Sequence, residues 1–346
     1  ALRAMLASFL IMAMIGGISA LRSWNYYAFV EDVTVGKAYF DRRNGFLRTG
    51  ATVIPSLLAL LASAGMLQVW MLKAKKQLSP LYAYAALGIL AFACFVTGAR
   101  GGWMAAIACV GTYVVLNYGS AALRKLSYAV AIVCVIIGFN LVFTDSDVLN
   151  DEYGTVSYRA ELIRTSVVQI QQRPLFGSSD IFNLPSFQHL RQGEGIIDLV
   201  NAYLQIVLFY GLVGLGSLLG AHAIGALAGL KELKLLPERR AASPAQAEQR
   251  RTLSFLLAFH AGYLVLIATI SFVAQVPHYG YLILAVLIAQ VRVLKTQRLA
   301  QAAPAKKEDI SLEDMPAPVE TAPSPTPSSS GRKDPVPYGA RFVRRQ

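Results

Sequence analysis

The sequence predicts an all-α fold, a polytopic membrane bundle of about eight transmembrane helices with a long, partly helical outer loop. Of the 346 residues, 15% are charged and 55% are hydrophobic, whereas about a quarter of the residues of a soluble domain are charged. The hydrophobic residues also form uninterrupted blocks of about 20, the length that a helix needs to cross a bilayer. The blocks lack the alternation of apolar and polar residues that is typical of β-barrel strands. We therefore expect each block to form a helix, in which all backbone N–H and C=O groups are paired within the segment.

Each predicted membrane helix is one apolar block, and aromatic residues such as Trp70, Trp103 and Tyr118 mark several ends, as the headgroup layer favours. The blocks are 3–21, 51–72, 80–98, 103–119, 126–144, 200–229, 253–274 and 279–295. The first residue is Ala and a block begins almost at once, so we expect a natural N-terminal portion to precede it. A secretory signal is the other interpretation of residues 1–20.

Lys and Arg gather in alternate connections, at 73–76, 124–125 and 231–251. The positive-inside rule places these connections in the cytoplasm. The outer segments are then about 22–50, the turn around Arg100, about 145–199, and the turn near His278. Residues 1–296 form the predicted membrane domain. Residues 297–346 are rich in Pro, Ala and Ser, which predicts a disordered cytoplasmic tail.

The formal net charge of +12 lies in loops and tail, so we expect membrane lipid and no nucleic acid as a partner. The three cysteines, Cys94, Cys109 and Cys134, lie in apolar blocks and predict neither disulfides nor a metal site. The blocks contain almost no ionisable residues besides His222 and His260. This scarcity argues against an ion-coupled transporter.

The basic residues predicted on the outer side are nearly all arginine, whose guanidinium group grips phosphates and carboxylates in bidentate geometry. They are Arg22, Arg42, Arg43, Arg48, Arg100, Arg159, Arg164, Arg173 and Arg191, with Lys37 as the exception. Loops as long as 145–199 are usually functional, and a helical period predicts a helix over 156–172 within it. The pattern indicates anion binding on the outer side, with compositional drift as the alternative.

Several short motifs, in their order and spacing, resemble bacterial O-antigen ligases and O-antigen polymerases. They are Thr97–Trp103 (TGARGGW), Tyr158-Arg159, Arg173–Gly177 (RPLFG), Asn201–Gln205 (NAYLQ) and Tyr210–Leu215 (YGLVGL), preceded by Arg48-Thr49-Gly50. The resemblance spans roughly residues 40–295. It implies a GT-C-like membrane glycosyltransferase with its active site on the periplasmic face of the bacterial inner membrane. Members of the family have more membrane helices than are counted here.

The resemblance also implies an inverting transfer of a glycan from undecaprenyl pyrophosphate to an acceptor sugar, with no metal or cofactor required. Arg100 and Arg159 are the expected contacts to the diphosphate, because preorganised guanidinium groups stabilise charge as it develops. Asp198 is the candidate base for the acceptor hydroxyl, with helix capping or another structural role as the alternative. The candidate substrate-binding residues are Arg48, Arg164, Arg173, Asn201 and Tyr203.

Ligases of this family resemble one another in a His shortly before the Asn of the Asn-x-Tyr-Leu segment, where this chain has Val200. The difference favours a polymerase of O-antigen or exopolysaccharide repeat units over a ligase. The expected partners are a lipid-linked oligosaccharide donor, a glycan acceptor, membrane lipid and other polysaccharide-assembly proteins. A polysaccharide flippase or other transporter, and a non-catalytic scaffold for envelope assembly, are the alternatives.

Overall fold

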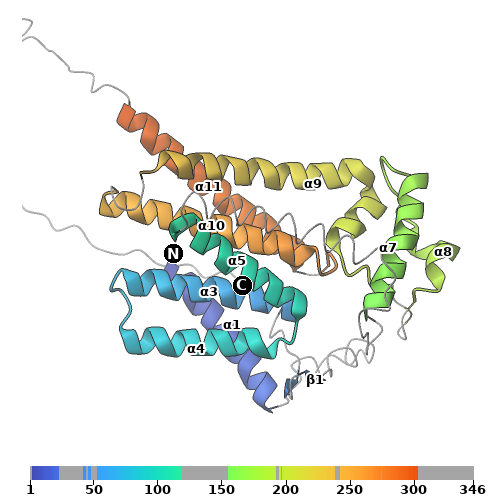
Figure 1. Ribbon diagram of the computed structural model, residues 1–346, viewed down its shortest axis with the longest axis horizontal. Coiled ribbons are helices and arrows are strands. Elements are labelled where there is room, and N and C mark those ends of the chain that lie inside the picture. Colours follow the sequence, from blue (N-terminus) through green and yellow to red (C-terminus); the bar gives the residue numbers. More distant parts are fainter. Residues whose placement is uncertain are drawn as a thin grey trace, which may run out of the picture. The chain divides into compact units, whose positions relative to one another are not determined.

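The computed structural model describes residues 2–22, 42–43, 46–47, 53–118, 155–191, 195, 197–237, 242–273 and 275–302. Most of these residues are in helices (Figure 1), so the predicted all-α class is confirmed. Two strands of two residues each, β1 (Arg42–Arg43) and β2 (Phe46–Leu47), pair antiparallel. The chain divides into one unit of residues 1–300 and a second of 301–346. The predicted tail lies outside the described residues from 303 onward.

The long helices coincide with predicted membrane blocks, although several ends differ. They are α1 (Leu2–Arg22), α3 (Pro55–Ala74), α4 (Pro80–Val96), α5 (Arg100–Tyr118), α9 (Ala202–Leu235), α10 (Pro244–Ile267) and α11 (Val276–Ala302). The predicted outer loop contains α7 (Thr155–Gln172), the 3-10 helix η3 (Ile181–Asn183) and the short α8 (Pro185–Gln188). The predicted block 126–144 and the first part of the predicted loop, residues 145–154, lie outside the described residues.

Among the described helices, α1, α3, α5, α9 and α11 are long and apolar enough to cross a membrane. Helix α4 is equally apolar but shorter, at 17 residues. Helix α10 has Glu248, Arg250 and Arg251 in its first half, so only its second half is apolar. The chain is therefore a multi-pass helical membrane protein.

Helix α10 departs most from its predicted block, 253–274, because polar residues define both of its ends. Ser243 and Gln246 form a capping box at its start, and Pro244 follows in the first turn, where a missing N–H removes no helical hydrogen bond. At its other end, the Thr269 hydroxyl donates to the Leu266 carbonyl oxygen at 2.8 Å. The helix stops at Ile267, earlier than the hydropathy of the block indicates.

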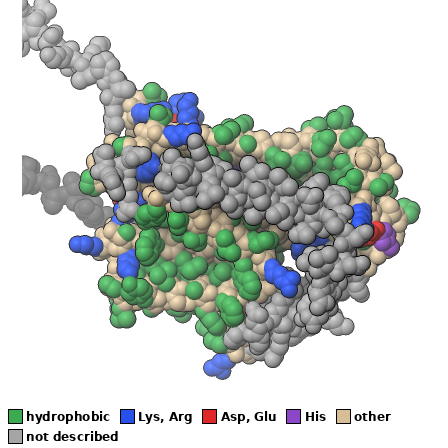
Figure 2. Space-filling view, in the orientation of Figure 1, with side chains coloured by type: hydrophobic (Ala, Val, Ile, Leu, Met, Phe, Trp, Pro, Cys, Tyr) green, Lys and Arg blue, Asp and Glu red, His purple; other side chains and the backbone are tan. Residues whose placement is uncertain are grey.

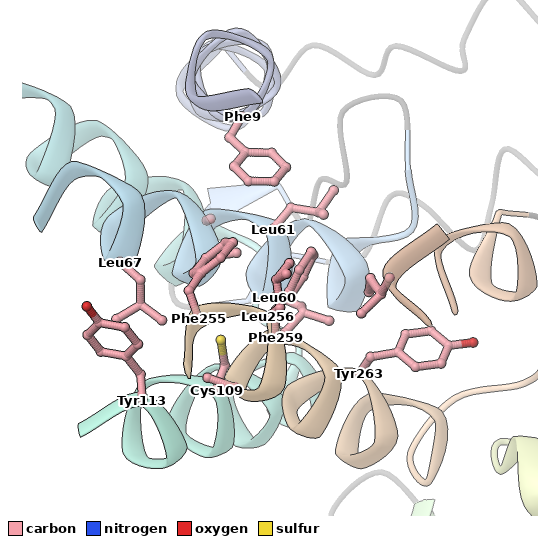
Figure 3. Close-up of a cluster of buried hydrophobic side chains, with 14 of the residues drawn as sticks. Phe9, Leu60, Leu61, Leu67, Cys109, Tyr113, Phe255, Leu256, Phe259 and Tyr263 are labelled. Atoms are coloured by element: carbon pink, nitrogen blue, oxygen red, sulfur yellow. The ribbon is translucent and has the colours of Figure 1, made fainter. Parts of the chain in front are cut away.

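The main hydrophobic core surrounds α3, which packs against α1, α4, α5 and α10. Most side chains of α3 are buried on every side, as expected for a helix that is apolar all round. Figure 3 shows Phe9 of α1, Leu60 of α3, Cys109 of α5 and Phe255 and Phe259 of α10 in this core. On the face drawn in Figure 2, apolar side chains cover the middle of the described helices, and Lys and Arg lie nearer the helix ends.

Polar contacts join several helix ends at one end of the bundle. The contacts are Lys75 with Glu248, Arg298 with Glu232 (3.1 Å), and Arg250 with the carbonyl oxygens of Leu233, Leu236 and Leu116 (3.1, 3.3 and 3.5 Å). These residues belong to the ends of α3, α5, α9, α10 and α11 whose connections the sequence predicts to be cytoplasmic. The structure therefore brings that predicted set of ends together.

Candidate functional site

The turn between α4 and α5 begins the polar end opposite those contacts. Gly98 has a φ of 56°, a conformation that favours glycine. Two donors converge on the Cys94 carbonyl oxygen, the Thr97 hydroxyl at 2.8 Å and the Trp103 indole N–H at 2.9 Å. Arg100 is the first residue of α5 and is exposed, so the helix begins three residues before the predicted block.

Two glycines after Arg100 let the start of α5 pack closely against its neighbours. A Cβ atom at Gly101 would lie 2.2 Å from the Thr269 Oγ1 atom, in the segment that follows α10. A Cβ atom at Gly102 would lie 2.9 Å from the carbonyl oxygen of Ser56, at the start of α3. The Gly-Gly pair of the motif is thus explained by packing.

Asp198 lies just before α9 and is tied to the same segment after α10. Its Oδ1 atom accepts hydrogen bonds from the Ser271 hydroxyl and, at 3.1 Å, from the Val200 N–H, which also donates to Ser271 Oγ at 3.0 Å. Its carbonyl oxygen accepts from the Tyr158 hydroxyl of α7 at 3.0 Å. Among the described residues, none donates a hydrogen bond to the second carboxylate oxygen.

Asn201, and not Asp198, caps α9. Its side-chain oxygen accepts from the N–H groups of Tyr203 and Leu204 at 2.9 and 3.1 Å, the arrangement of an N-cap. The capping role considered for Asp198 is therefore filled by Asn201, whereas the hydrogen bonds of Asp198 to Ser271, Val200 and Tyr158 leave a structural role open. The Tyr203 hydroxyl donates to the Leu264 carbonyl oxygen of α10 at 2.9 Å, so both of these candidate binding residues have polar groups engaged in the fold.

The structure links the segments that contain Arg100, Arg159 and Asp198. Gly101 lies against Thr269, Ser271 binds Asp198, and Tyr158, next to Arg159, binds the Asp198 carbonyl oxygen. Arg100 and Arg159 are exposed, and neither forms a hydrogen bond or ion pair with another described residue. The segment 268–273 contacts the Arg100 and Asp198 segments, and the Arg159 segment is linked to them through the Asp198 carbonyl oxygen.

The other arginine candidates are placed differently. Arg164 is exposed one and a half turns beyond Arg159 on α7. Arg173 follows the end of α7, about 21 Å from Arg159 along the helix axis at 1.5 Å per residue, and its Nη1 donates to Ser178 Oγ at 3.0 Å. Arg173 is thus separated from Arg159 by most of the helix and is held by Ser178. Arg48 lies outside the described residues.

The RPLFG motif fits into a break in α9 at Gly211, where the backbone has a φ of 66° and a ψ of −168°. The break frees two N–H groups, and the motif supplies their acceptors: Leu212 donates to the Pro174 carbonyl oxygen at 2.8 Å and Val213 to that of Leu175 at 3.2 Å. In return, the Leu208 carbonyl oxygen, which would otherwise accept from Leu212, accepts from the Ser178 N–H at 2.8 Å.

Glycines in both the RPLFG loop and α9 make this close contact, called here the interlock, possible. Gly177 has a φ of 64°, and a Cβ atom there would lie 2.4 Å from the Leu208 carbonyl oxygen. A Cβ atom at Gly211 would lie 2.1 Å from the Leu175 carbonyl oxygen. A small hydrophobic cluster then holds α7, η3 and α8 against the start of α9. Its buried members are Leu162, Ile181, Phe187, Leu190, Ile197, Leu199 and Leu208.

Sequence reasoning missed Ser271, whose hydroxyl orients the Asp198 carboxylate. Ser271 was part of the predicted membrane block 253–274, in which averaged hydropathy hides single polar residues. The available signal was the pair Thr269 and Ser271 near the end of that block. Within the described ranges, no group of three or more His, Cys, Asp and Glu side chains is placed to hold a metal ion.

The fold and this polar end define a class: a multi-pass helical membrane protein with exposed arginines and a half-buried carboxylate in segments that contact one another. Residues 85–219 match the family profile described as O-antigen ligase. These residues are thus similar to that family, and the resemblance seen in the motifs is confirmed. A comparison with curated proteins found no match. The matched region includes every candidate site residue except Arg48, and Ser271 lies outside it.

Proposed function

We propose that the protein is an inverting membrane glycosyltransferase that polymerises or transfers undecaprenyl-pyrophosphate-linked glycan repeat units at the periplasmic face of the bacterial inner membrane. The observation that supports this most is that Arg100, Arg159 and Asp198, all within the matched region, belong to segments that contact one another in series. Residues 268–273 contact the Arg100 and Asp198 segments, and Tyr158 links α7 to Asp198. The proposed reaction needs cations to bind the departing diphosphate and a base to accept the proton of the acceptor hydroxyl.

The position of Arg100 supports a role in binding an anion. The N-terminus of a helix bears partial positive charge, so a cation on the first residue of α5 is electrostatically unfavourable in the free protein. A bound phosphate would reverse this penalty, because it would contact the guanidinium group and face the unpaired N–H groups of the first turn. Arg159 lies in the second turn of α7 and would contact the same group from its own helix.

In the proposed reaction, an acceptor sugar hydroxyl attacks the anomeric carbon of the donor glycan. The bond from that carbon to the diphosphate oxygen breaks with inversion, and undecaprenyl pyrophosphate leaves with the electron pair. Arg100 and Arg159 stabilise the charge that develops on the diphosphate. The second carboxylate oxygen of Asp198 takes the proton from the hydroxyl, while Ser271 and the Val200 N–H hold the first.

The choice of polymerase over ligase rests on Val200. A ligase of this family would have a His near this position, and the Val200 side chain supplies no base. Val200 also has a φ of 45°, which is strained for a β-branched residue by about 1–2 kcal/mol, and such strain is commonest at functional sites. Ligase activity is the second candidate, favoured by the description of the matched family.

A gel of surface polysaccharide from a deletion strain tests the proposal. A polymerase deletion leaves single-repeat species, whereas accumulated carrier-linked polymer with an uncapped lipid core would replace the polymerase assignment by ligase. An unchanged polysaccharide profile would refute the glycosyltransferase function.

The same strain, complemented with variants, tests the two arginines. Arg100→Ala and Arg159→Ala should each abolish polymer formation while the protein reaches the membrane in normal amount. Arg22→Ala is the matched control, because Arg22 is an exposed arginine at the end of α1 and is not part of these motifs. Normal long chains from either test variant would remove that arginine from the mechanism.

A further inference from the structure

The RPLFG loop exposes large apolar side chains at the break in α9. Leu175 and Phe176 are 57% and 73% exposed, and Tyr210, directly before the break, is 66% exposed. The backbone of the loop is fixed to α9 through Pro174 and Leu175, so these three side chains form one patch, called here the loop tip. An exposed apolar patch of this kind marks an interaction surface.

The length of the second half of α9 gives the depth of the loop tip in a membrane. From Leu212 to Leu230 the helix contains no Asp, Glu, Lys or Arg, and Lys231 follows. These residues span about 28 Å at 1.5 Å each, close to the roughly 30 Å thickness of the hydrocarbon core. With Lys231 at one boundary of that core, the break at Gly211 lies at the other boundary.

The loop tip also continues the lipid-facing surface of α9. Leu212, Leu219, Ile224 and Leu227 on this half-helix are between 42% and 70% exposed, so a bilayer is the environment that covers them. Satisfied backbone groups are required wherever an irregular segment enters lipid. The hydrogen bonds of Leu212 and Val213 to the loop meet this requirement at the break.

We propose that Leu175, Phe176 and Tyr210 insert into the bilayer at the boundary between headgroups and acyl chains, about 5–10 Å deep. The bilayer lipid is the occupant of this surface. The inserted tip fixes the end of α7 at the membrane, and with it the height of Arg159 above the surface. This inference concerns membrane contact alone and holds whether or not the proposed transferase reaction is correct.

Depth-dependent quenching tests the insertion on the full chain in phosphatidylcholine vesicles. An environment-sensitive nitrobenzoxadiazole label is attached at Phe176→Cys, and lipids with a nitroxide near the headgroup or near the chain end serve as quenchers. Ser179→Cys, an exposed position shortly after the loop tip, is the matched control. Leu219→Cys reports the acyl region, and the labelled parent chain gives the background from native cysteines.

The label at 176 should lose most of its emission to the shallow quencher and less to the deep one, while the label at 179 stays largely unquenched. Equal, weak quenching at 176 and 179, with strong quenching at 219, would overturn the proposal and leave the patch to a protein partner. If the labelled Phe176→Cys protein is not monodisperse on gel filtration, Leu175→Cys gives the same test from the neighbouring side chain.

Discussion

Replacing Gly211 by Ala should destabilise the protein strongly, because two costs coincide at this residue. The backbone there, with a φ of 66° and a ψ of −168°, lies in a region that is almost restricted to glycine and costs about 1–3 kcal/mol for other residues. The new Cβ atom would also lie 2.1 Å from the Leu175 carbonyl oxygen. The loop must therefore move away, and each N–H left without its acceptor costs a further 1–3 kcal/mol or so.

Together these effects predict a loss of about 3–9 kcal/mol in the free energy of unfolding, or on the order of 10 °C in the melting temperature. The melting temperature is measured in detergent by fluorescence-detected gel filtration. Gly216→Ala and Gly220→Ala are matched controls on the same helix, since a Cβ atom at either position meets nothing within 4 Å. Both should melt at or slightly above the temperature of the parent protein.

Gly177→Ala removes the same interlock from the loop side, where the new Cβ atom would lie 2.4 Å from the Leu208 carbonyl oxygen. The double variant should therefore lose much less than the sum of the two single losses. If Gly211→Ala melted with its controls, or if the two losses simply added, the loop would not be the element that completes the broken helix.

Two further predictions concern residues at opposite ends of the bundle. Asp198→Asn should lower the rate of polymer formation by about 10²- to 10⁴-fold if Asp198 is the base. Ser271→Ala should lower the rate by about tenfold because the carboxylate loses its positioning, and Ser271→Thr should restore most of the rate. Unchanged rates in membranes that contain equal amounts of protein would remove both roles. Arg298→Ala leaves the buried Glu232 carboxylate without its partner at 3.1 Å and should lower the melting temperature by several degrees. Adding Glu232→Gln to Arg298→Ala should recover most of that loss. A double variant that melts as low as Arg298→Ala would contradict the pairing.

Most of the helices could be predicted from the sequence, because a helix that crosses lipid must be apolar over its whole length. The alternation of basic connections also predicted which helix ends lie on the same side of the membrane. Contacts between those ends, such as the one between Lys75 and Glu248, agree with that prediction. The end of α10 did not follow, since one Thr and one Ser hardly change the average hydropathy of a block. The start of α5 at Arg100 was missed for a related reason, because charge and glycine both count against a membrane helix.

The break in α9 was beyond local sequence reasoning. Gly211 lies in an apolar stretch with other glycines, and Gly216 and Gly220 show that a glycine there is compatible with regular helix. What distinguishes Gly211 is the loop ending at Gly177, whose carbonyl groups replace the helical acceptors. Likewise, the sequence offered Asp198 as a base or a helix cap, and the cap is assigned to Asn201 only by the hydrogen bonds that its side chain accepts from the Tyr203 and Leu204 N–H groups.

The motifs behind the family resemblance contain two kinds of residue, and the structure separates them. The glycines at 101, 102, 177 and 211 are required by close backbone approaches. Arg100 and Arg159 are not explained in this way: both are exposed, and among the described residues neither has a hydrogen-bond or ion-pair partner. At Arg100 the charge even opposes the helix dipole. The exposed guanidinium group of Arg100, at a helix start where its charge is unfavourable without an anion, supports the anion binding proposed above.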